Sequence, residues 1–115
     1  MNIEVISSSV TLEHLKEIAD SGFGDFVKAV VDVQLGTMAI GGELHADEEA
    51  ILIERGSRQR ALWGINIYPD LQGDDRVEFD SMINIRPAQG NRSRGVDDPA
   101  IRESIVRIVE QLVVQ

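Results

Sequence analysis

The chain has 115 residues, of which 43% are hydrophobic and 27% charged, which is the composition of one ordinary globular domain. It contains no cysteine, which excludes disulfide bonds, thiol catalysis and thiolate metal sites. Its formal net charge is −9, and repulsion from phosphate groups argues against nucleic-acid partners. The sequence shows neither a membrane-length apolar run nor a leader peptide, so we expect a single soluble, cytoplasmic domain over residues 1–115 with no membrane partner.

Acidic and basic residues are unevenly distributed along the chain. Residues 1–54 hold eleven acidic and two basic side chains, whereas residues 55–115 hold nine of each, so the first half carries the whole net charge. The exception is the segment 86–95, which reads RPAQGNRSRG and has three arginines and no acidic residue. We therefore expect a small cationic loop on an otherwise acidic protein.

The apolar pattern of the first 45 residues predicts a strand, a helix and a hairpin. Thr11 is a suitable N-cap for the helix, and Gly22 or Gly24 is suited to end it. A three-residue connection that ends in Gly36 has a common hairpin length, and we expect the second hairpin strand to continue as far as His45. The expected elements are a strand at 2–6, a helix that begins at 12, and strands at 27–33 and 37–45.

The remaining residues predict two helices that flank a second hairpin. Residues 47–55 begin with acidic residues and end with an arginine before Gly56, which favours a helix. Residues 61–68 and 77–86 alternate around a polar turn, and a helix is expected from Pro99. The order β-α-β-β-α-β-β-α indicates an α+β fold, a two-layer sandwich in which a mostly antiparallel sheet of four or five strands carries about three helices on one face.

Alternation in the second hairpin separates a core face from a polar face. Trp63 and the isoleucines of two similar segments, INIYP and INIRP, lie on the predicted core side. A hairpin centred near residue 73 makes Asn66 a neighbour of Asp80, so their side chains could hydrogen-bond and brace the floor of a pocket. A solvated sheet face is the alternative. The residues predicted on the polar face are Asn66, Tyr68, Glu78, Asp80, Asn84 and Arg86.

A histidine and several carboxylates lie close together after the first hairpin. If this segment is a strand, Glu43 and His45 project on one side, and Asp47 follows. His45 is then a candidate general base, with Glu43 and Asp80 as candidate catalytic carboxylates. The same groups and Asp47 could instead bind a divalent cation, or the acids could be ordinary helix-start residues. His14 is expected to be a solvated residue of the first helix.

The loop after the second hairpin is rich in groups that bind anions. Glycines, backbone N–H groups and arginine side chains are the components of an oxyanion or phosphate cradle. Alternatively, the arginines pair with nearby acids and the loop is polar only for solvation. The candidate ligand-binding residues are Asn66, Asn84, Arg86, Gln89, Asn91, Arg92 and Arg94.

The sequence contains none of the standard phosphate-loop, dinucleotide, zinc-protease or serine-hydrolase motifs. The leading hypothesis is therefore a domain that binds a small anionic ligand through the loop at 86–95, near His45, with no cofactor implied. The first alternative is a metal-dependent hydrolase that uses Glu43, His45, Asp47 and Asp80. The second is a homodimer or partner-binding module, whose interface is an open sheet edge or the polar face.

Four segments together carry a resemblance that spans the whole chain. They are DFVKAVVDVQLGTMAIGG at 25–42, GGELHADEEA at 41–50, LWGINIYPD at 62–70 and EFDSMINIRPAQGNRSRGVDDP at 78–99. With them, the chain resembles a small family of uncharacterised bacterial proteins, catalogued as a domain of unknown function. The resemblance implies a bacterial domain that stands alone, and it implies no reaction, cofactor or catalytic residue.

Overall fold

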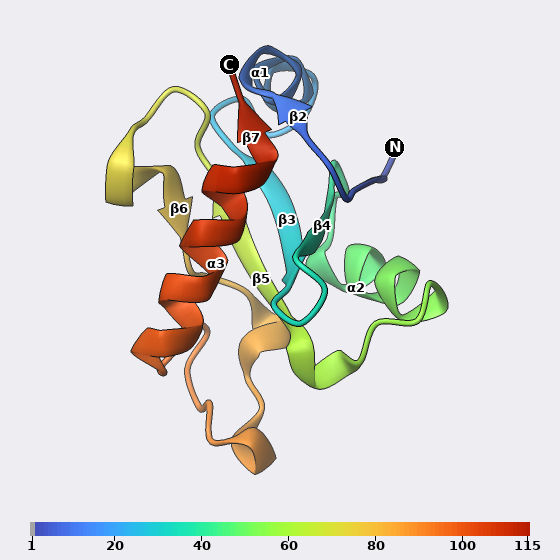
Figure 1. Ribbon diagram of the computed structural model, residues 1–115, viewed down its shortest axis with the longest axis vertical. Helices are drawn as coiled ribbons and strands as arrows, with labels where there is room; N and C mark the ends of the chain where they lie inside the picture. Colours follow the sequence, from blue (N-terminus) through green and yellow to red (C-terminus); the bar gives the residue numbers. More distant parts are fainter. Residues whose placement is uncertain (1) are drawn as a thin grey trace.

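A five-stranded antiparallel sheet forms the centre of the computed structural model, which describes residues 2–115 (Figure 1). The strand order β1-β4-β3-β5-β6 places β3 in the middle, paired with β4 on one side and β5 on the other. The strands are β1 (Glu4–Ile6), β3 (Val27–Asp32), β4 (Thr37–Ile40), β5 (Leu62–Ile67) and β6 (Val77–Glu78). The predicted α+β class is confirmed, and the predicted order of strands and helices matches apart from two additional two-residue strands.

The three α-helices are α1 (Leu12–Ser21), α2 (His45–Glu54) and α3 (Pro99–Leu112). Thr11 caps α1, because its hydroxyl accepts the N–H of His14 at 3.1 Å. Asp98 caps α3, and Pro99 occupies the first turn, where its missing N–H costs nothing. Both starts agree with the sequence prediction. No described side chain caps α2, which begins two residues earlier than predicted.

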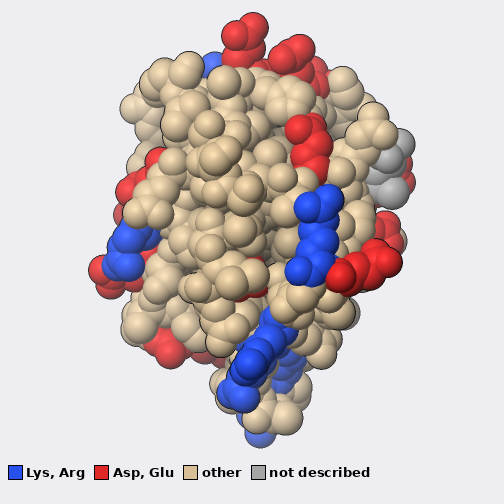
Figure 2. Space-filling view, turned by 45° about the vertical axis from the view of Figure 1, so that its right-hand side comes forward, with Lys and Arg blue, Asp and Glu red and all other residues tan. Residues whose placement is uncertain are grey.

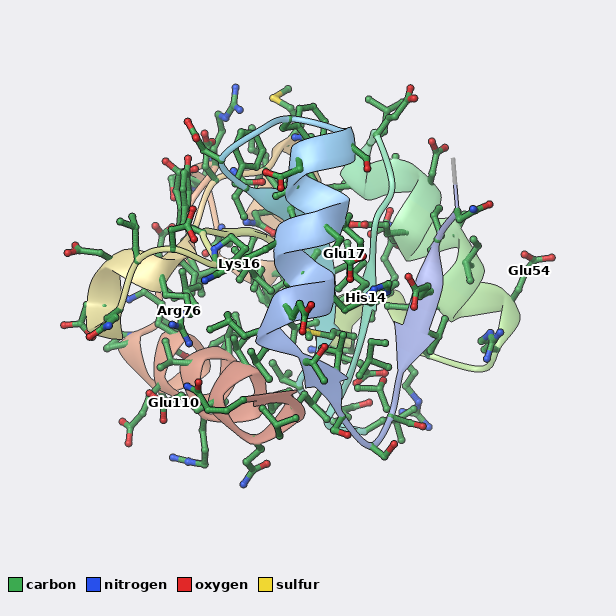
Figure 3. The ribbon with its side chains drawn as sticks, turned by 90° about the horizontal axis from the view of Figure 1, so that it is seen from above. His14, Lys16, Glu17, Glu54, Arg76 and Glu110 are labelled. Carbon is green, nitrogen blue, oxygen red and sulfur yellow. The ribbon has the colours of Figure 1, made fainter. Side chains whose placement is uncertain are left out.

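The helices pack on both faces of the sheet, whereas the sequence predicted one face. Leu15 of α1 and Ile105 of α3 share the main core with Ala29 of β3. A second apolar cluster, made by Val30, Ala39, Leu52 and Leu62, places α2 on the opposite face. Seen from above in Figure 3, α2 (green) and α3 (red) lie on different sides of the molecule. The prediction of one covered face failed because the central strand β3 is apolar on both faces, and each apolar face is buried by packing against a helix.

The first hairpin forms in the predicted register, but its second strand is shorter. Ala29 pairs with Ile40, and the connection turns at Gly36, which has φ +71°. β4 then stops at Ile40, so the predicted continuation to His45 is wrong. Gly41 adopts φ +90°, and a Cβ at this position would lie 2.7 Å from a backbone oxygen of Asn2. The close passage of the N-terminal strand therefore ends β4 here.

The second hairpin differs most from the sequence prediction. β6 has only two residues, and Asn66 pairs with Glu78 rather than with Asp80. Beyond β6 the chain leaves the sheet and forms 3-10 turns at Met82–Asn84 and Pro87–Gln89. The predicted alternation over 79–85 is consequently wrong: the side chain of Asn84 is fully buried, and that of Ile85 is 38% exposed.

Two further features complete the fold. β2 (Val10–Thr11) and β7 (Val113–Val114) form a short parallel pair that joins the end of the chain to the start of α1. 3-10 turns at Gln59–Ala61 and Gly73–Arg76 lie on either side of β5 in the chain. Among the described residues, no helix is long and apolar enough to cross a bilayer.

Candidate functional site

A row of three polar side chains crosses the sheet on the face that carries α2. Lys28 on β3 pairs in register with Asn66 on β5, which in turn pairs with Glu78 on β6. Their strand neighbours, such as Val27 and Ile67, face the main core, so these three side chains face the other way. We call Lys28, Asn66 and Glu78 the polar row.

Asn66 has a buried acceptor that the protein leaves unpaired. The side chain is 5% exposed, and its Nδ2 donates to Glu78 Oε1 at 2.8 Å. This bond fixes the amide, because the reverse orientation would place two acceptors against each other. Asn66 Oδ1 is buried and accepts no hydrogen bond from the described residues. Because such an oxygen costs about 1–3 kcal/mol, a donor from outside the chain would relieve it.

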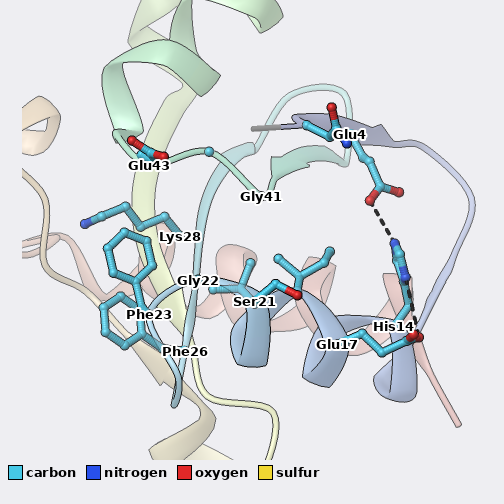
Figure 4. A pocket seen from close by; sticks show the side chains of 14 residues that line it. Glu4, His14, Glu17, Ser21, Gly22, Phe23, Phe26, Lys28, Gly41 and Glu43 are labelled. Atoms are coloured by element: carbon cyan, nitrogen blue, oxygen red, sulfur yellow. Dashed lines mark hydrogen bonds and ion pairs between the residues drawn. The ribbon is translucent and has the colours of Figure 1, made fainter.

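Lys28, the register partner of Asn66, supplies a cation on the same face of the sheet. Its ammonium lies 5.2 Å from the centroid of the Phe23 ring and 5.8 Å from that of the Phe26 ring. The two rings stack on each other with centroids 4.8 Å apart. None of the ion pairs found among the described residues involves Lys28, and its charge acts on His45 and on the buried Glu48. An anion that approaches this ammonium also comes near the carboxylate of Glu43, which lines the same end of the groove (Figure 4).

His45 lies at the start of α2, against β5. Its imidazole is 7% exposed, and Nε2 lies 2.7 Å from the carbonyl oxygen of Ile65, so Nε2 carries the proton and donates it. Burial lowers the pKa of His45, and the hydrogen bond to Ile65 opposes this shift. The imidazole is therefore neutral at pH 7, with Nδ1 as its basic nitrogen. This close approach requires Gly64, where an added Cβ would lie 3.2 Å from Cγ of His45.

Of the cationic loop at 86–95, the end that carries Arg94 comes near His45. Arg94 Nε donates to Asp80 Oδ1 at 2.6 Å. The charge of Asp80 raises the pKa of His45, and that of Arg94 lowers it, so the pair lies within electrostatic reach of the ring. Arg92 is exposed, and its backbone N–H donates to Asp97 at 3.2 Å. The structure thus brings His45, Asp80 and Arg94 together.

Asn84 and Asn91, predicted as ligand-binding residues, are used inside the protein. Asn84 Oδ1 accepts the N–H of Gly64 at 2.8 Å, and its Nδ2 donates to the carbonyl oxygen of Gly64 at 3.0 Å. Nδ2 of Asn91 donates to the carbonyl oxygens of Asn84 and Gly95, both at 2.8 Å. The two amides hold the loop against β5, so we assign them a structural role.

Arg86 and Gln89 also fasten the loop to the chain before β5. The guanidinium of Arg86 donates to the carbonyl oxygens of Gln59 and Leu62 and lies 4.2 Å from the centroid of the Trp63 ring. Burial lowers its pKa. Gln89 Nε2 donates to the carbonyl oxygen of Arg60 at 2.7 Å. These side chains leave little of the predicted cradle available to a ligand. Figure 2 shows that basic side chains still gather at the lower end of the molecule.

The predicted catalytic and metal-binding groups are separated by the early start of α2. Glu43 precedes the helix and lines a groove, whereas His45 turns toward β5. Among the described residues, no three histidine or carboxylate side chains are placed to hold a metal ion together. Catalysis by Glu43, His45 and Asp80 stays a prediction, as does the hydrolase that would use them with Asp47.

The groove beside the polar row has a volume of about 470 Å³ and lies between the end of α1 and the segment 41–43 (Figure 4). Lys28 stands at one end with Phe23 and Phe26. His14 stands at the other end, where its Nε2 lies 2.8 Å from Glu4 Oε2 and its Nδ1 3.9 Å from Glu17 Oε1.

Sequence reasoning missed both ends of this groove. The sequence predicts a solvated His14, and the side chain is 41% exposed, but its bond to Glu4 joins two separate elements and was missed. The sequence did offer evidence for Lys28. It is a charged residue within the apolar strand segment VKAVV, and a charged side chain in a central strand is rarely buried without a function or a partner.

Comparison with curated proteins gave no match, and neither did comparison with solved structures. One family model matches residues 4–112, nearly the whole chain, and it is described as a protein of unknown function. The match agrees with the resemblance noted in the sequence, although it assigns no activity. The chain therefore belongs to the family described as protein of unknown function (DUF5674).

Proposed function

We propose that this protein binds a small molecule that carries an anionic group next to a hydrogen-bond donor, and that the molecule sits on the polar row. The observation that carries the proposal is the amide oxygen of Asn66, which is buried, held in orientation by Glu78, and without a donor among the described residues. A hydroxyl, amino or N–H group of the ligand would supply that donor.

Three positive groups around this oxygen favour an anion, against the opposing carboxylates of Glu78 and Asp80. Lys28 neighbours Asn66 across the β3–β5 pair, and its ammonium is unpaired among the described residues. The N-terminus of α2 lies on the same face without a side-chain cap, and its dipole adds a weak positive potential. Arg94, held by Asp80, adds a cation at the side of His45. The proposed ligand site thus includes Arg94, at the end of the predicted loop 86–95. The other predicted residues of this loop keep structural roles.

The test is a titration of ¹⁵N-labelled protein with acetate, glycolate and inorganic phosphate, followed by NMR. The side-chain NH₂ signals of Asn66 report directly on the site. We expect glycolate and phosphate to shift these signals more strongly than acetate, because both carry a hydroxyl donor for Asn66 Oδ1 beside the charge.

The variant Lys28→Met should abolish the response to all three anions. Lys16→Met is the matched control, because Lys16 is the other lysine of the sequence and pairs with Asp70 on the surface at 3.4 Å. Unchanged Asn66 and Lys28 signals in the wild-type protein, at every concentration that keeps the protein folded, would show that the proposal is wrong.

A homodimer or partner-binding module stays a prediction. Its observable basis is the edge of the sheet at β1, which among the described residues pairs only with β4. Light scattering after size exclusion measures the self-association form directly, and a monomer at high protein concentration would contradict it.

A further inference from the structure

We infer that the ligand is a monoacid with a flat, apolar body, such as an aromatic carboxylate, and that this body enters the groove between the phenylalanine rings and the segment 41–42. This inference rests on the proposed function and specifies its ligand class. It starts from one side chain: Lys28 belongs to the polar row and also lines the groove, so a molecule whose acidic group meets Lys28 has the groove beside it.

One wall of the groove is aromatic and already ordered. Phe23 stacks on Phe26 with an interplanar angle of 11°, and Phe26 in turn contacts the ring of Tyr68, with centroids 5.4 Å apart. Phe23 remains 45% exposed, although it is a large apolar ring. A further ring stacked on this wall would bury apolar surface without the cost of ordering the wall first.

Three glycines contribute backbone to the other walls of the groove. Gly22 ends α1 on one side, and Gly41 and Gly42 stand on the other (Figure 4). A side chain at Gly42 would collide with Glu48, whose Cγ would lie 2.9 Å from the new Cβ. Backbone at these glycines lets a flat body approach closely, while Ile18, Ser21 and Glu43 supply the neighbouring side chains of the groove. A volume of about 470 Å³ lies within the range of small-molecule sites.

The far end of the groove limits the charge of the ligand. Glu4 and Glu17 both flank His14 there, with Glu4 at 2.8 Å and Glu17 at 3.9 Å. A second anionic group at this end would meet two carboxylates and be repelled. For this reason we infer a monoacid rather than a diacid.

The test compares dissociation constants of acetate, benzoate and terephthalate, measured by NMR titration of the wild-type protein. We expect benzoate to bind about tenfold more tightly than acetate, because a stacked aromatic pair contributes about 0.5–1.5 kcal/mol beyond the area that it buries. Terephthalate, which carries a second carboxylate, should lose this gain. Benzoate should shift the signals of Phe23, Gly41 and Gly42 in addition to those of Asn66.

Phe23→Leu should lower the ratio of the affinity for benzoate to the affinity for acetate from about ten to about one. Phe79→Leu is the matched control, because Phe79 packs against the main core and lies outside the groove. Benzoate that binds no tighter than acetate, or that binds equally well to Phe23→Leu, would overturn the inference and leave the proposed function standing. If neither acid binds while glycolate and phosphate also fail, both are wrong.

Discussion

Glu48 shows most clearly what burial does to a single residue. It belongs to the acidic start of α2, yet its side chain is fully buried, and burial raises its pKa to about 9. Oε2 accepts the N–H of Gly42 at 2.9 Å, and Oε1 has no partner among the described residues. The carboxyl group is therefore neutral at pH 7, where an exposed glutamate is ionised.

The raised pKa of Glu48 predicts that the protein becomes less stable as the pH rises. In the unfolded chain this carboxyl loses its proton near its ordinary pKa of 4.5, whereas the folded protein keeps it until about 9. The folded state binds the extra proton throughout this window, so the free energy of unfolding falls by up to about 1.4 kcal/mol per pH unit. Urea denaturation at a series of pH values measures the slope.

Glu48→Gln is the matched variant for this prediction. It keeps an acceptor for Gly42 and cannot ionise, so it should flatten the slope and stabilise the protein above neutral pH by on the order of 1 kcal/mol or more. Equal slopes in the variant and the wild-type protein would show that Glu48 is ionised in the folded state.

His45 acts in the opposite direction at low pH. Its folded-state pKa is lowered, so the unfolded chain binds a proton first as the pH falls below 6.5. The variant His45→Gln should therefore lose less stability than the wild-type protein between neutral and mildly acidic pH. The comparison of the two denaturation midpoints is the measurement, and parallel losses would contradict this role of His45.

At the scale of elements, the side chain of Asn84 makes the hydrogen bonds that a longer β6 would have made to β5. Where β6 ends, the amide of Asn84 bonds both backbone groups of Gly64 and so occupies the edge of β5 that a longer strand would have paired. The same Nδ2 also donates to the carbonyl oxygen of Arg94 at 2.9 Å. This arrangement releases the following residues from the sheet, and the released chain carries Arg94 to the surroundings of His45.

Asn84→Ala should therefore destabilise the protein by about 2–4 kcal/mol, because it leaves the N–H and C=O of Gly64 without these partners and removes one of the two hydrogen bonds to the carbonyl oxygen of Arg94, which keeps the N–H of Ser81. Asn84→Asp keeps the acceptor for the N–H of Gly64 and loses both donated bonds. Chemical denaturation of the two variants gives the comparison. A loss below about 0.5 kcal/mol for Asn84→Ala would show that water satisfies these groups as well as the amide does.

At the scale of the whole molecule, the net charge of −9 lies on one compact body with a radius of gyration of 12.8 Å. The ion pairs among the described residues are exposed, such as Arg107 with Glu103, and contribute little to stability. Repulsion among the acids therefore dominates the effect of salt. Raising NaCl at pH 7 should increase the thermal midpoint, by an amount equivalent to about 1 kcal/mol. A midpoint that falls with NaCl would contradict this expectation.

The sequence by itself determined those elements whose evidence is local. The caps Thr11 and Asp98 satisfy N–H groups two or three residues away, and the hairpin at Gly36 joins neighbouring strands, so each can be found from a short window. The α+β class followed from the order of these elements. The same reasoning placed Asn66 on the face opposite the main core, where the proposed site lies.

Only the tertiary structure decided where the second half of the chain goes and which residues form the site. Asn84 and Gly64 are 20 residues apart, as are His45 and Ile65, and no periodicity shows which buried backbone group a distant side chain satisfies. An alternating pattern assumes that polar side chains face the solvent. It therefore placed Asn84 on the polar face and Ile85 on the core face, whereas Asn84 is buried and Ile85 is 38% exposed. Lys28 and the groove became visible only when β3, α1 and the segment after β4 were placed side by side, because the site is made of contacts between elements.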